Sequence, residues 1–104
     1  MDISTELLKK YGLNTFEEYS EAWTEIQSEE IKQVQFYKLF LNATDHIPLI
    51  IFENYIVYMV ENNVNVGSMK KFFSDVKTEY ADVLEARKIA REEINRIEAE
   101  MATE

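Results

Sequence analysis

The sequence predicts an all-α protein of four or five helices, arranged as a helical bundle with a long, coiled-coil-like helix at the C-terminus. The chain of 104 residues contains only two glycines and one proline, so tight turns are few and the segments between them are long. Apolar residues also recur at spacings of three and four along most of the chain. At this length we expect a single domain over residues 1–104.

The first part of the domain, residues 1–42, is predicted to form acidic N-terminal helices. Ser4 is placed to cap a short first helix, because a serine side chain can accept a hydrogen bond from the free N–H groups of a first turn. Gly12 suits the left-handed position that often follows the end of a helix.

A second helix is predicted to start at Thr15. Thr15 and Glu18 have the spacing of a capping box, and apolar residues follow on one helical face. Two alternatives remain open for residues 15–42. Either Ser28 divides them into two helices, or they form one rod of about 42 Å.

Residues 43–62 are the most apolar segment, and they predict a central helix that is buried on most sides, with Thr44 or Asp45 as its cap. The isoleucines and valines would also suit a strand, but a single strand would have no partner. The segment is short and is interrupted by Glu53 and Asn54, so we expect it not to span a membrane.

Residues 68–102 predict a long helix that follows a polar connector, with Ser68 as its cap. A straight helix from Ser68 to Met101 would measure about 51 Å, whereas a compact globule of 104 residues would be about 33 Å across. The apolar seam of the helix must then be covered by the 15–42 segment of the same chain or by the same helix of a second chain, and we expect the second chain. The seam is heptad-like and contains Phe73, Val76, Tyr80, Val83, Arg87, Ala90, Ile94, Ile97 and Met101.

The predicted self-association would form a homo-oligomer, with a dimer favoured. Arg87 is the polar residue within the seam, and such a residue can set the register between helices, although its long stem can also reach the surface. The protein-binding residues predicted for this contact are Val83, Arg87, Ala90, Ile94, Ile97 and Met101.

A resemblance to a group of viral proteins rests on the same region. The stretch "ATDH", the apolar segment after it, a short linker and "YADVLEARKIAREEINRIE" together resemble the C-terminal part of short proteins predicted in tailed bacteriophages and prophages. The resemblance covers roughly residues 42–98. It implies a phage source and, loosely, a structural or tail-associated setting, and it supplies no catalytic residues.

Acidic residues recur every four positions near the N-terminus, with no basic residue from position 14 to position 31. On one continuous helix they would form an acidic stripe, which is most often a solvated face. It could also bind a basic groove, as a nucleic-acid-mimicking inhibitor would. The net charge of −9 argues against direct contact with nucleic acid or with an anionic membrane. The residues of the predicted stripe are Glu17, Glu21, Glu25 and Glu29.

No catalytic, cofactor or metal site is predicted. The chain has no cysteine, and its one histidine, His46, has no clustered partner. The start of the chain lacks a signal-peptide core, so we expect a cytoplasmic location in the host cell or a place in the virion.

Together these observations predict a small, non-enzymatic, phage-encoded interaction or structural module that self-associates through its C-terminal helix. The alternative is an acidic anti-defence inhibitor that binds a basic host protein.

Overall fold

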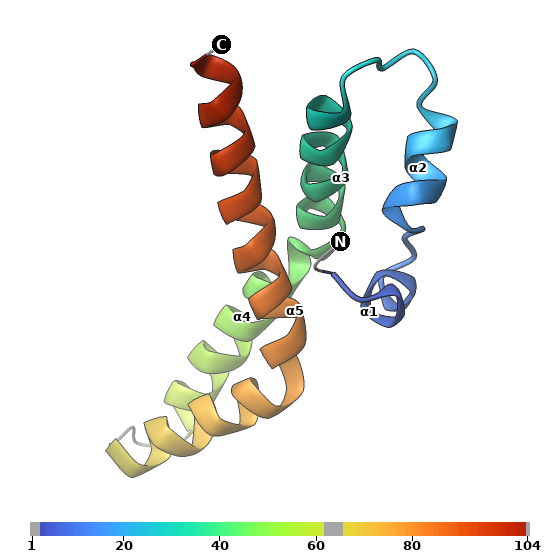
Figure 1. Cartoon of the computed structure of the whole chain (residues 1–104). Coiled ribbons are helices and arrows are strands. Elements are labelled where there is room, and N and C mark those ends of the chain that lie inside the picture. The colour runs from blue at the N-terminus through green and yellow to red at the C-terminus, as the bar shows by residue number, and fades with distance from the viewer. Residues whose placement is uncertain (1–2, 62–65, 104) are drawn as a thin grey trace.

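The computed structural model describes residues 3–61 and 66–103. Within these ranges the chain forms five helices and no strand, which confirms the predicted all-α class and the long C-terminal helix (Figure 1). That helix begins at residue 66, so Ser68 falls inside it, and the side chain of Ser68 lies outside the described part of the structure. The helices are α1 Thr5–Lys10, α2 Phe16–Ala22, α3 Glu29–Thr44, α4 His46–Glu61 and α5 Val66–Ala102.

The first two helices begin as their sequences predict, and α1 also ends as predicted, whereas α2 ends at Ala22, before the predicted break at Ser28. The Ser4 hydroxyl accepts a hydrogen bond of 3.1 Å from the N–H of Leu7, and the Thr15 hydroxyl accepts one of 3.3 Å from the N–H of Glu18. Gly12 follows α1 with a φ of 77°, the left-handed conformation that glycine adopts at low cost.

The break at Ser28 divides residues 15–42 into two helices. Residues 23–28 are not helical. The Ser28 hydroxyl accepts a hydrogen bond of 3.3 Å from the N–H of Ile31 and so caps the start of α3. The chain can therefore turn between α2 and α3, and the single rod is excluded.

The main core lies where α3 runs beside the second half of α5, and α1 and α2 cover the other side of α3 (Figure 1). We call α1, α2, α3 and residues 81–102 of α5 the body. Lys32 ties α2 to α3, because its Nζ donates a hydrogen bond of 2.9 Å to the carbonyl oxygen of Ser20. The buried residues at the α3–α5 contact are Val34, Phe36, Tyr37 and Phe40 of α3 and Val83, Ala86, Ala90, Ile94 and Ile97 of α5.

The central apolar helix, α4, leaves the body instead of entering it. It runs beside the first half of α5, and only Ile47 along its length is buried. The prediction of a helix buried on most sides is therefore wrong, because α4 packs mainly against one neighbour. The Thr44 hydroxyl donates back to the carbonyl oxygen of Phe40 at 2.9 Å, so Thr44 belongs to the end of α3 and does not cap α4.

The molecule is elongated as a result. Its radius of gyration is 17.3 Å and its principal extents are 55 × 31 × 18 Å, whereas a compact chain of this length would have a radius of gyration of about 13 Å. Helix α5 is continuous over 37 residues and is bent between its two halves (Figure 1). Thr78 donates a hydrogen bond of 3.0 Å to the carbonyl oxygen of Ser74, a type of bond that bends helices.

Candidate functional site

The seam predicted for self-association is used largely within one chain. Val83 and Ala90 have no exposed surface, and Ile94 and Ile97 are buried with them against α3. Among the six residues predicted for the self-contact, only Met101, at the end of α5, keeps a substantial exposed fraction. The expected covering by a second chain is therefore corrected. The cover is α3, whose buried residues pack against these residues of α5.

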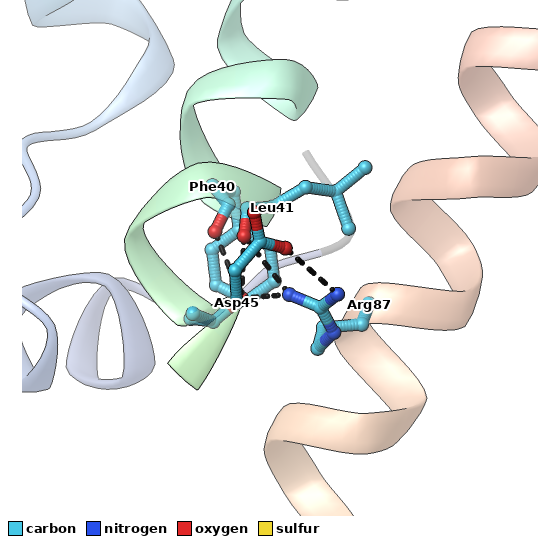
Figure 2. Close-up of polar contacts among 5 residues, drawn as sticks. Phe40, Leu41, Asp45 and Arg87 are labelled. Carbon is cyan, nitrogen blue, oxygen red and sulfur yellow. Dashed lines mark hydrogen bonds and ion pairs between the residues drawn. The ribbon is translucent and has the colours of Figure 1, made fainter. Parts of the chain in front are cut away.

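Arg87 is also engaged within its own chain, at the end of α3 (Figure 2). Its Nη1 donates hydrogen bonds of 2.9 Å to the carbonyl oxygen of Leu41 and 2.7 Å to the hydroxyl of Thr44. Its Nη2 donates a bond of 3.1 Å to Asp45 Oδ1. The last carbonyl groups of a helix have no partner inside the helix, and α3 has no basic residue in its last turn. Arg87 supplies the missing donors from α5 and so sets the register between α5 and α3.

The four glutamates of the predicted acidic stripe are all exposed, but they do not share one helix. Glu17 and Glu21 lie on α2, Glu25 lies in the segment between helices, and Glu29 begins α3. The stripe is therefore wrong as a single helical face. Glu17 and Glu29, each with the glutamate next to it, occupy the first turns of α2 and α3, where a negative charge stabilises the positive end of the helix dipole.

The described residues offer no candidate metal site. No group of three or more histidine, aspartate and glutamate side chains in residues 3–61 and 66–103 could hold a metal ion. The ring of His46 contacts the ring of Tyr11, with 6.0 Å between centroids.

Within residues 3–61 and 66–103, no helix is long and apolar enough to cross a membrane.

The remaining feature is the pair formed by α4 and residues 66–80 of α5, which we call the distal hairpin. Its inner contact is a small aromatic cluster. The ring of Phe72 lies 5.2 Å from that of Tyr55 and 5.5 Å from that of Tyr58, and Phe73 lies 6.0 Å from Tyr55. Of these four rings only that of Phe72 is buried. The two helices therefore hold each other through one row of contacts and leave their outer faces uncovered.

One side of the distal hairpin is apolar and exposed, and we call it the apolar face. At 100° per residue its five α4 side chains fall within about 100° of one another, so they lie on one side of the helix. Val60, Leu49 and Phe52 are 81%, 69% and 62% exposed. The apolar face consists of Leu49, Phe52, Ile56, Met59 and Val60 of α4 and Phe73 of α5.

A groove of about 490 Å³ lies beside these residues, between the two helices. None of its lining side chains carries a charge. It is lined by Pro48, Ile51, Phe52, Tyr55, Phe72, Phe73, Val76 and Leu84.

The other side of the distal hairpin is acidic. A second groove, of about 290 Å³, is lined there by Glu61, Asp75 and Glu79 together with apolar neighbours. Burial and the adjacent Glu79 carboxylate raise the pKa of Tyr80, which lines the same groove. Three carboxylates therefore gather at this groove, although the exposed Val57 also lines it.

The composition of α4 carries a signal for the apolar face. Between residues 46 and 61 the only acidic residues are Glu53 and Glu61, and neither lysine nor arginine occurs. A helix with so few charges is expected to be buried, but it can be buried only where other elements surround it.

No family model, no curated protein and no solved structure matches the chain.

Proposed function

We propose that this chain is a non-enzymatic protein-interaction module and that the apolar face of the distal hairpin is its contact surface. The observation that carries the proposal is the exposure of six large apolar side chains on one side of two packed helices. At about 200 Å² for a large apolar residue, their exposed fractions leave roughly 700 Å² of apolar surface in water. The largest such patch on a monomeric protein is usually about 300 to 600 Å².

The proposed class of function is the one predicted from the sequence, but the contact surface is the distal hairpin and not the C-terminal seam. Burial of a large apolar side chain contributes about 1.5 to 3 kcal/mol, and the second half of the α5 seam already gains this within its own chain. The unsatisfied apolar surface lies at the opposite end of α5. The resemblance of residues 42–98 to short phage and prophage proteins supports a structural or tail-associated setting for such a module.

Site-specific photocrosslinking in the cells that produce the protein tests this location. A photoreactive phenylalanine analogue replaces Leu49 on the apolar face, Ile31 on α3 or Glu25 between α2 and α3, one position at a time. All three positions are exposed, so the label is equally free to react. We expect light-dependent adducts at Leu49 and none at Ile31. A lack of adducts at Leu49, and at Phe52 when the label is placed there in a fourth variant, would show that the face has no protein partner.

The same experiment separates the acidic-inhibitor alternative. If the glutamates bind a basic host protein, adducts form at Glu25 and become weaker as salt is added, because salt screens attraction between exposed charges. Contacts made by the apolar face do not weaken with salt. Adducts at Glu25 alone would favour the inhibitor over the interaction module proposed above.

A further inference from the structure

The apolar face also indicates what kind of partner covers it. Resting on the function proposed above, we infer that the partner is a second copy of this chain and that two distal hairpins pack face to face as a four-helix bundle.

The shape of the face supports this partner. Both helices contribute to the face, because Phe52 of α4 and Phe73 of α5 are exposed and line the same groove, so a single additional helix would leave part of the surface in water. A second pair of helices covers both and completes the arrangement in which four helices enclose one core. The groove between Phe52 and Phe73 is open to receive an apolar side chain from the facing copy.

The area of the face is also close to what a stable dimer needs. The roughly 700 Å² of exposed apolar surface on each copy compares with about 800 Å² per partner in a standard protein interface. Neighbouring residues such as Pro48 and Tyr55 extend the surface at its edge. A two-fold dimer would therefore bury an interface of ordinary size.

The distribution of charge permits a face-to-face pair. The six residues of the apolar face carry no charge, and the carboxylates of Glu61, Asp75 and Glu79 lie on the other side of the hairpin. The exposed Glu53 lies at the edge of the face, about 40° around α4 from Leu49. Pairing therefore leaves the acidic side in solvent. Each copy still carries a net charge of −9, so two copies repel each other at a distance. Added salt screens this repulsion, and we expect the dimer to become tighter as salt increases.

Sedimentation equilibrium of the purified full chain, over a range of protein and salt concentrations, tests the inference. The wild type is expected to approach twice the chain mass of 12.3 kDa. Phe52→Glu and Ile56→Glu place a charge in the centre of the apolar face and should raise the dimer dissociation constant roughly 30-fold or more, as loss of a central interface residue does. Ile31→Glu makes the same change at an exposed apolar residue of α3 and should leave the constant unchanged. Circular dichroism shows that each variant keeps its helices.

The outcomes that would overturn the inference are distinct. A wild type that stays at 12.3 kDa, or a dimer that both hairpin variants leave intact, excludes a second copy on this face. If Leu49 then crosslinks to a different protein, the proposed function stands and only its partner is wrong. A monomer that floats with neutral phosphatidylcholine vesicles would assign the face to a lipid surface. Failure of crosslinking at the hairpin as well would remove the proposed function itself.

Discussion

Arg87 donates a hydrogen bond of 2.7 Å to the hydroxyl of Thr44, a residue 43 positions away in the sequence. Thr44 has no exposed surface, and its hydroxyl in turn donates to the carbonyl oxygen of Phe40. One side chain of α5 therefore completes the polar network at the end of α3, close to Asp45, the single residue that separates α3 from α4. No buried side-chain nitrogen or oxygen in the described residues lacks a partner.

Replacing Arg87 should destabilise the protein through its buried contacts. Arg87→Met keeps most of the side-chain volume but removes the charged donor to Leu41 and Thr44, and the loss of hydrogen bonds from a charged group costs about 1.5 to 3 kcal/mol. Asp45→Asn is the matched control. The Asp45 side chain is 59% exposed, so its ion pair should contribute less than about 1 kcal/mol. Urea unfolding measures the free energy of unfolding of both variants. A larger loss for Asp45→Asn than for Arg87→Met would mean that the ion pair is the more important contact.

Truncating a buried side chain of the α5 seam should destabilise the body without affecting self-association. Ile97 is almost fully buried against α3, so Ile97→Ala should lower the free energy of unfolding by about 2 to 5 kcal/mol. Met101→Ala, at the exposed end of the same helix, should cost less than about 1 kcal/mol. Neither change should alter the dimer dissociation constant. A higher dimer dissociation constant for Ile97→Ala would indicate that the C-terminal seam, and not the apolar face, forms the dimer contact.

The cap at Ser28 should contribute measurably to stability, because it begins the helix that covers α5. Ser28→Ala removes the acceptor for the N–H of Ile31, and loss of such a cap costs about 1 kcal/mol. Ser74→Ala makes the same chemical change inside α5 and should be neutral or slightly stabilising, since alanine favours helices. Equal effects of the two changes on the urea midpoint would show that the Ser28 hydroxyl does not act as a cap.

The ion pair between Arg96 and Glu93 predicts a pH dependence with a definite sign. The hydrogen bond from Arg96, 2.6 Å from Nη2 to Glu93 Oε2, lowers the pKa of Glu93 below its ordinary value of 4.5. A carboxyl group with a lowered pKa in the folded state stabilises the fold above that ordinary value, and the contribution disappears as the pH falls through the folded pKa. The difference in urea midpoint between wild type and Arg96→Gln should therefore be small at pH 7, because the pair is exposed, and should shrink below 4.5. A difference that grows in acid would contradict this assignment.

The features predicted correctly from the sequence are those that depend on neighbours within a few residues. The caps at Ser4 and Thr15 and the left-handed Gly12 each follow from local hydrogen bonds and local sterics. The helical class follows in the same way from apolar spacing. These interactions form in the same manner wherever the segment lies in the fold.

The errors concern contacts between distant segments. The acidic stripe assumed one helical phase across residues 23–28, and the break there places Glu25 and Glu29 on different elements from Glu17. The seam residues were identified as a packing surface, but apolar spacing does not distinguish a partner in the same chain from one in another. For α4, high apolar content predicts burial, whereas the helix leaves the body after Asp45 and packs mainly against α5.

Because one uninterrupted helix belongs to both the body and the distal hairpin, α5 should exchange its amide hydrogens at two very different rates. Around Ala90 the helix is held by a dense core, so exchange requires opening of the whole domain. Around Phe73 only one neighbouring helix holds it, and local fraying suffices. Occupancy of the apolar face would slow exchange in the second region alone, so a single stretch of backbone reports both the integrity of the domain and the presence of its partner.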